Sequence, residues 1–155
     1  MQGHCADWTM WRHDAGRTAS TGQELSTNLN LQWTREYPAL KTAWPDPAIE
    51  SHRMPFDLVY QPVVEGKTMY VGSSLSDKVT ALDTDTGEEK WTFYTDGPVR
   101  FAPAALHGKV YCTSDDGWLY CLRGKDGKLL WKFRGGPSDR KVLGNDRLIS
   151  AWPAR

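Results

Sequence analysis

At 155 residues, the chain has the length of one ordinary domain. Its 19 Lys and Arg residues balance its 19 Asp and Glu residues, which excludes a net field that would attract nucleic acid or an anionic membrane surface. No apolar run approaches the roughly 20 residues of a membrane-spanning helix, so we expect a chain that neither binds nucleic acid nor crosses a membrane.

Residues 1–27 are predicted to form an N-terminal arm. Aromatic and charged residues are interleaved between Asp7 and Thr18 without a helical or a strand period, which indicates an extended, partly packed segment. Residues 1–6 contain no apolar stretch of the kind that a signal peptide needs, so we expect no signal peptide within this chain.

Residues 28–36 are predicted to form a strand, because Leu29, Leu31 and Trp33 alternate with polar residues. The strand ends in Trp, as two later repeat units do, so we interpret it as the outer strand of an incomplete unit. Residues 37–55 form a proline-rich insertion loop, in which the prolines exclude a regular helix or a central strand. Such a loop is either functional or a lid over an exposed edge, and the sequence leaves both interpretations open.

Two stretches, residues 81–91 (ALDTDTGEEKW) and residues 121–131 (CLRGKDGKLLW), repeat each other at a spacing of forty residues. Each has apolar ends and a polar middle in which Asp and Gly favour a hairpin turn, Asp by bonding its own backbone and Gly by taking a positive φ. The chain is therefore predicted to be a repeat protein. The positions that recur are Leu82, Gly87, Trp91 and Phe93 in the first unit and Leu122, Gly127, Trp131 and Phe133 in the second.

The repeat predicts an all-β fold, a fragment of a β-propeller. Residues 56–96 and residues 97–135 each divide into four short strands separated by turn signals, which is typical of a propeller blade. Residues 136–155 begin a third blade that is truncated. Because a blade cannot bury its own faces, we expect its partners to be the remaining blades of a longer chain or further copies of this chain.

The cysteines Cys112 and Cys121 flank a turn signal at residues 115–117. With a two-residue loop the two cysteines would face each other across the hairpin, whereas with a three-residue loop Cys112 would pair with Tyr120. A disulfide and two buried free thiols both remain open at this point.

Other patterns are interpreted as structural. Gly66-Lys67-Thr68 ends like a phosphate-binding loop, but Gln61 stands where that loop needs its first Gly. Asp83 and Asp85 lack the twelve-residue spacing of a calcium loop and are interpreted as turn formers. The four His residues are scattered without ligand spacing, so we predict no metal site and no catalytic residue.

The pattern A-x-D-x-x-T-G-x-x-x-W of residues 81–91 resembles the repeat of the quinoprotein-like (pyrroloquinoline quinone-like, PQQ-like) β-propellers. The resemblance covers about residues 56–137, and residues 11–18 (WRHDAGRT) are similar to the arm that precedes such propellers in large bacterial extracytoplasmic proteins. A WD40 propeller is excluded, because Thr92 and Lys132, rather than Asp, follow the two repeated Trp residues.

The resemblance implies a structural role for four residues. In the family, the Trp at the end of each outer strand stacks on a peptide of the next blade. Trp91 and Trp131 would dock blades in this way, and Gly87 and Gly127 would make the turns.

The resemblance also implies two alternative functions. The first is a non-catalytic module without a cofactor, a scaffold or a surface that binds a protein partner, in an extracytoplasmic (periplasmic or secreted) bacterial protein. The alternative is an N-terminal piece of a PQQ- and calcium-dependent dehydrogenase that oxidises alcohols. Redox members of the family bind PQQ and calcium in the central channel of the complete propeller. The channel-facing residues that this chain could contribute are Asp57, Gln61, Arg100 and Arg140.

Overall fold

The computed structural model describes residues 7–39, 59–144 and 147–153, which contain ten strands and no helix. The predicted all-β class is confirmed, and the described residues contain no helix able to cross a membrane. The strands are β1 (Val63–Glu65), β2 (Thr68–Ser73), β3 (Lys78–Asp83), β4 (Glu89–Tyr94), β5 (Ala104–Leu106), β6 (Lys109–Thr113), β7 (Trp118–Arg123), β8 (Leu129–Arg134), β9 (Lys141–Gly144) and β10 (Arg147–Ser150).

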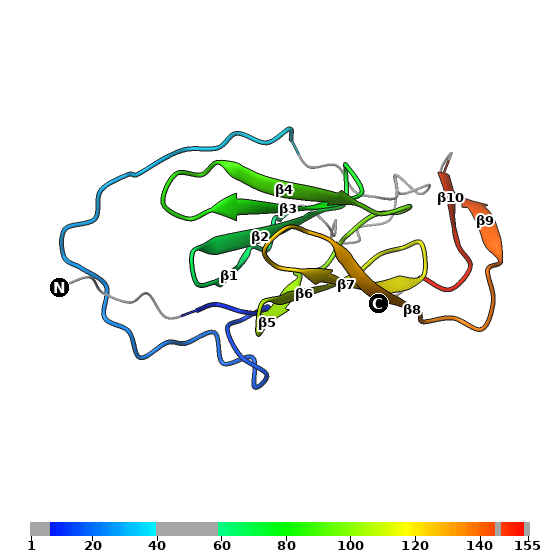
Figure 1. Ribbon diagram of the computed structural model, residues 1–155, viewed down its shortest axis with the longest axis horizontal. Helices are drawn as coiled ribbons and strands as arrows, with labels where there is room; N and C mark the ends of the chain where they lie inside the picture. Colours follow the sequence, from blue (N-terminus) through cyan, green and yellow to red (C-terminus); the bar gives the residue numbers. More distant parts are fainter. Residues whose placement is uncertain (1–6, 40–58, 145–146, 154–155) are drawn as a thin grey trace, which may run out of the picture.

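Strands β1 to β4 form one four-stranded antiparallel sheet and β5 to β8 form a second, each in sequence order. The short strands β1 and β5 lie next to each other, and β9 and β10 make a separate hairpin beyond the second sheet (Figure 1). Two consecutive sheets of this kind are propeller blades, as the sequence predicts. The first strand of each blade is short, because Pro62 and Pro103 have no N–H to donate to a ladder and β1 and β5 begin directly after them.

The turn between β3 and β4 shows why the repeated Asp and Gly are needed. Asp83 Oδ1 accepts hydrogen bonds from the backbone N–H of Asp85 at 2.8 Å and of Thr86 at 3.2 Å. Gly87 has a φ of 74° and donates its N–H to Asp83 O at 2.8 Å. In the second blade Gly127, with a φ of 69°, makes the same bond to Arg123 O. Asp83 is thus a turn former, whereas the Asp85 carboxylate pairs with Lys67.

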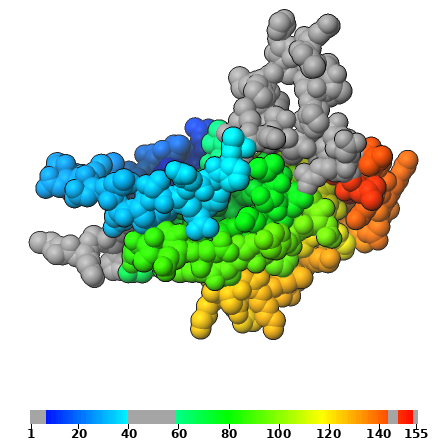
Figure 2. Space-filling view, turned by 90° about the horizontal axis from the view of Figure 1, so that it is seen from above, coloured from blue at the N-terminus to red at the C-terminus, as the bar shows by residue number. Residues whose placement is uncertain are grey.

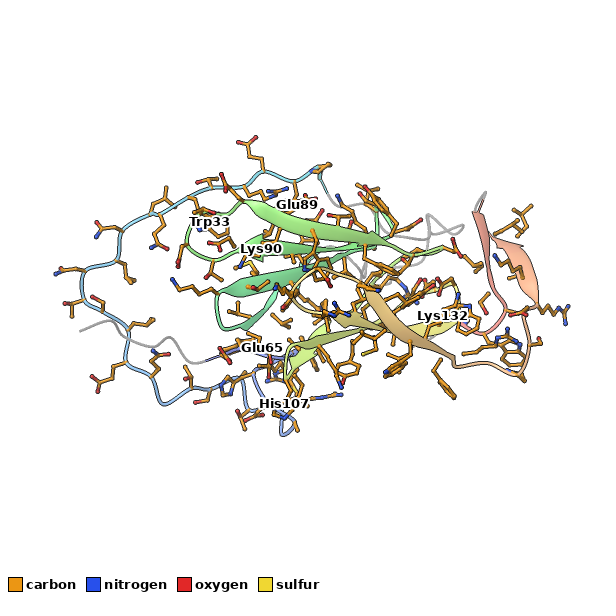
Figure 3. The ribbon with its side chains drawn as sticks, in the orientation of Figure 1. Trp33, Glu65, Glu89, Lys90, His107 and Lys132 are labelled. Carbon is orange, nitrogen blue, oxygen red and sulfur yellow. The ribbon has the colours of Figure 1, made fainter. Side chains whose placement is uncertain are left out.

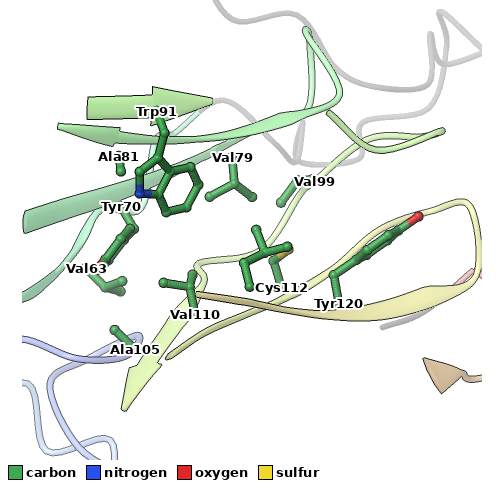
Figure 4. Packing of buried hydrophobic residues seen from close by; sticks show 11 residues of the cluster. Val63, Tyr70, Val79, Ala81, Trp91, Val99, Ala105, Val110, Cys112 and Tyr120 are labelled. Carbon is green, nitrogen blue, oxygen red and sulfur yellow. The ribbon is translucent and has the colours of Figure 1, made fainter. Parts of the chain in front are cut away.

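The hydrophobic core lies between the two blades rather than inside either one (Figure 4). The rings of Phe93 and Tyr120, one from each blade, meet edge to face with centroids 5.5 Å apart. A blade therefore depends on its neighbour to remove its apolar face from water. The buried cluster comprises Val63, Tyr70, Val79, Ala81 and Trp91 from the first blade and Val99, Ala105, Val110, Cys112, Tyr120 and Leu122 from the second.

The cysteines follow the three-residue-loop alternative. Cys112 is opposite Tyr120 in the β6–β7 ladder, and Cys121 is opposite Tyr111. Side chains alternate along a strand, so the two thiols lie on opposite faces of the sheet and both are buried and free. Burial raises the pKa of Cys112 to about 12, so its thiol stays protonated and serves as a small apolar side chain.

The segments before the first blade differ from the expectation in one respect. Residues 28–36, which the sequence predicts as an outer strand, form no strand ladder, although Arg35 lies beside β4, the edge strand of the first sheet. The arm does pair: the backbone of Trp8 exchanges two hydrogen bonds with Val64 of β1, and Thr9 O accepts one from Ala105 of β5. The arm thus spans both blades at their first strands. Most of the predicted insertion loop, beyond residue 39, lies outside the described residues.

Candidate functional site: tryptophan docking and the open blade face

Trp91 joins the two blades by covering a turn of the second one. Its Nε1–H donates to Gly124 O at 2.8 Å, and its ring lies against Gly127. A Cβ added to Gly127 would lie 2.6 Å from Trp91 Cε3, so no residue larger than Gly fits beneath this ring. The Trp side chain is only 9% exposed.

Trp33 makes the same contact with the first blade. Its Nε1–H donates to Thr84 O at 2.9 Å, and a Cβ on Gly87 would lie 2.6 Å from its Cδ2. Arg35 supports it by donating to Gly87 O and to the Glu89 carboxylate, both at 3.2 Å. Trp33 and Glu89 lie at the same end of the first blade (Figure 3). The segment around Trp33 therefore packs on the first blade in the same way as β4 packs on the second. The sequence indicates this role only by a Trp at the end of an alternating stretch.

Trp131 occupies the matching position on β8 but covers no turn of the described residues. It is 45% exposed, against 9% for Trp91, and its ring lies near that of Tyr111 of its own sheet, with centroids 6.0 Å apart. This part of the second blade projects on the side away from residues 28–39 (Figure 2). We call its exposed residues the open face: Leu129, Leu130, Trp131 and Phe133, which are 38–65% exposed.

The open face continues into a wide hollow of about 600 Å³. Leu119 and Phe133 of the second blade line it, together with Trp152, which follows β10. Leu119 and Phe133 correspond, at the forty-residue spacing, to Val79 and Phe93, which pack into the core between the blades. The open face is thus the surface that a further blade would cover.

We expect Gly127→Ala to destabilise the protein more than Gly108→Ala, although the two glycines have φ values of 69° and 70°. Both alanines meet the strain of a left-handed backbone, about 1–2 kcal/mol. A Cβ at Gly108 has no heavy atom within 4 Å, whereas one at Gly127 collides with the Trp91 ring. Urea unfolding should therefore give Gly127→Ala a further loss of about 2 kcal/mol or more. Equal losses would show that ring contact with this glycine does not hold the blades together.

The structure brings together two of the four candidate channel residues. Gln61 and Arg100 line one small hollow of about 10 Å³, room for a single water molecule. Gln61 Oε1 accepts a hydrogen bond from Ala102 N at 3.2 Å. Arg140 lies apart from them, exposed in the segment before β9. Asp57 lies outside the described residues.

Arg100 is instead part of a buried polar network that sequence reasoning missed. Its guanidinium donates to both carboxylate oxygens of Asp115, at 2.7 Å and 2.8 Å, and the Asp115 side chain is 2% exposed. The next residue, Asp116, accepts a 2.6 Å hydrogen bond from the Tyr120 hydroxyl and others from the N–H of Asp96 and Trp118. Burial, together with the bond to Asp116, raises the pKa of Tyr120 well above its usual range. The sequence indicates this network only by an additional acidic residue: the turn at residues 115–117 contains two Asp residues where one would be enough to form it.

These residues do not fit PQQ and calcium. The described residues contain no group of three His, Cys, Asp or Glu side chains that could hold a metal ion. Arg100 is bonded to Asp115, and the hollow that it shares with Gln61 is far below the roughly 300 Å³ of a small-molecule site. No chemical step through a quinone follows from this geometry.

Comparison with known proteins gives one family match over most of the chain. The family model described as outer membrane protein assembly factor BamB matches residues 9–151. No curated protein sequence matches.

Three similar solved structures correspond to parts of the chain. A europium-containing methanol dehydrogenase is 31% identical over 48% of this chain and 15% of its own, with a TM-score of 0.44. The quinohemoprotein alcohol dehydrogenase from Comamonas testosteroni is 32% identical over 48% of this chain and 13% of its own, with a TM-score of 0.44. BamB from Moraxella catarrhalis is 20% identical over 50% of this chain and 28% of its own, with a TM-score of 0.42. The matched part of this chain thus spans under a third of each of these structures.

Proposed function

Since this chain belongs to the PQQ-like β-propeller family whose model is described as outer membrane protein assembly factor BamB, we propose that it is a non-catalytic scaffold module that binds protein through its open face. The partner is a further blade, either of the same protein or of another copy of this chain. The family description supports placing the module in the bacterial envelope or among secreted proteins.

The observation that carries this proposal is the contrast between Trp91 and Trp131. The two residues are equivalent in the repeat, yet the first is buried on a glycine turn and the second stands 45% exposed. Exposed aromatic residues grouped with aliphatic ones are typical of protein-binding surfaces.

The two occupied positions define what the open face would bind. In each, the Trp ring lies on a glycine of positive φ and its Nε1–H reaches a carbonyl three residues earlier, at Thr84 for Gly87 and at Gly124 for Gly127. A partner for Trp131 must present the same combination, a hairpin turn with a left-handed glycine and a free carbonyl three residues before it. This requirement describes a blade of the same repeat class.

The dehydrogenase alternative has less support, because Arg100 is held by both carboxylate oxygens of the buried Asp115. It makes a different experimental prediction. A dehydrogenase piece in its full-length protein would bind PQQ with calcium, show quinone absorbance and oxidise alcohols with an artificial dye, whereas a scaffold would do none of these.

Sedimentation velocity of the chain over a range of concentrations tests the binding role. We expect concentration-dependent association that Trp131→Glu weakens by about tenfold or more, because a carboxylate on the open face would be buried unpaired. Trp11→Glu is the matched control, since Trp11 is 44% exposed on the arm, away from the open face. Association that survives Trp131→Glu, or a chain that stays monomeric throughout, would contradict binding between copies through this face.

A further inference from the structure

A second hollow, distinct from the open face, lies where the arm meets the entries to β1 and β5. Its volume is about 440 Å³, within the range of small-molecule sites. We call it the arm hollow. It is lined by Trp11, Arg17, Gln61, Phe101, Ala102 and Thr113.

Two aromatic rings from distant parts of the sequence form its apolar walls. Trp11 belongs to the arm and Phe101 to the segment before β5, and each is 44% exposed. Large aromatic side chains left half in water beside a hollow supply the apolar area that a ligand can cover.

The polar groups of the arm hollow are mainly hydrogen-bond donors. The Arg17 guanidinium lies 5.1 Å from the Trp11 ring centroid and forms no ion pair with a carboxylate of the described residues. Gln61 uses its Oε1 to accept from Ala102 N, so its Nε2 remains as the donor of that amide. Thr113 adds a hydroxyl that can donate or accept.

The nearest acidic residue of the arm does not neutralise Arg17. The Asp14 carboxylate accepts hydrogen bonds from Thr18 N at 3.0 Å and from Thr18 Oγ1 at 2.7 Å, which lower the pKa of Asp14. Its other polar neighbour is His13, whose Nδ1 lies 3.7 Å from an Asp14 carboxylate oxygen. A positive charge beside apolar walls is therefore left for a ligand to satisfy.

The arm is held in shape before any ligand binds. Arg17 N donates to Asp14 O at 2.9 Å, and Ala19 N donates to Arg12 O at 3.0 Å. These bonds keep Arg12 and Arg17 at φ values of 58° and 55°, in the left-handed region. Binding would thus not have to order the arm, which reduces its entropic cost.

From this arrangement we propose that the arm hollow binds a small carboxylate with an aromatic or apolar body. The carboxylate pairs with Arg17 and accepts from Gln61 Nε2, while the body lies between Trp11 and Phe101. This site does not include the open face. The carboxylate-binding proposal can therefore fail while the proposed scaffold function holds, and the scaffold function can fail while this proposal holds.

The probe is 4-fluorophenylacetate, followed by fluorine NMR during titration of the chain. We expect saturable binding that Arg17→Gln weakens about tenfold, as the loss of a charge-assisted hydrogen bond predicts. Trp11→Ala should weaken it similarly, through lost ring contact. The neutral isostere 2-(4-fluorophenyl)ethanol should bind about tenfold more weakly than the acid.

Arg123→Gln is the matched control, because Arg123 is an exposed arginine paired with Asp126 in the second blade. It should leave binding unchanged. Thermal unfolding of each variant separates lost binding from lost folding, and Arg17 and Trp11 are exposed enough to be replaced without unfolding the chain. Equal affinity for the acid and the alcohol, unchanged binding by folded Arg17→Gln, or no binding by the folded chain would overturn the proposal.

Discussion

Replacing Trp91 by Ala is expected to lower the free energy of unfolding by about 3–5 kcal/mol, the loss typical of a large buried aromatic side chain. The substitution removes the ring that covers Gly127 and the hydrogen bond to Gly124, and it opens a cavity in the core between the blades. Tyr70, whose ring centroid lies 5.8 Å from that of Trp91, would lose a partner as well. Urea unfolding monitored by circular dichroism measures the effect.

The same substitution at Trp131 is the control, since the chemistry removed is identical and only the surroundings differ. Trp131 is 45% exposed and covers no turn of the described residues, so its loss should cost about 1 kcal/mol. A ratio near one between the two losses would mean that docking on the next blade contributes little to stability. The two losses of unfolding free energy would become similar only in an assembly in which a further blade covers the open face.

The repeat could be predicted from the sequence because its period and turn residues are local properties. Asp83 and Gly87 favour the same turn wherever they occur, and the forty-residue spacing then aligns Trp91 with Trp131. Which of the two Trp residues is buried could not be predicted, because burial depends on whether another blade stands against the strand. Trp33 illustrates the converse: it docks on Gly87 although no strand forms around it.

The polar network could not be predicted for a related reason. Asp83 and Asp115 are both acidic residues at turns, but Asp83 stays partly exposed whereas Asp115 is 2% exposed. The difference comes from Arg100, which lies fifteen residues earlier in the same blade and reaches Asp115 only when that blade has folded. An Asp residue favours the turn wherever it occurs, but the packing of the folded chain determines which Asp carboxylate is buried.

Asp115→Asn should have an effect of similar size, a loss of about 3–5 kcal/mol, because it removes one partner of a buried ion pair. The Arg100 side chain is 12% exposed, and its charge would remain without the two short bonds that now compensate it. The backbone contact from Ser150 N to Asp115 O does not involve the side chain and should persist. The loss therefore reports on the carboxylate, measured as the change in urea unfolding midpoint at constant m-value.

Asp126→Asn provides the comparison, since Asp126 and its partner Arg123 are both 46% exposed and their ion pair should contribute under about 0.5 kcal/mol. Replacing Arg100 by Met together with Asp115 by Leu should recover most of the stability lost in Asp115→Asn, because an apolar pair carries no buried charge. Such recovery would assign the loss to the uncompensated guanidinium. If the double variant is no more stable than Asp115→Asn, the carboxylate acts through the packing of its loop rather than through its charge.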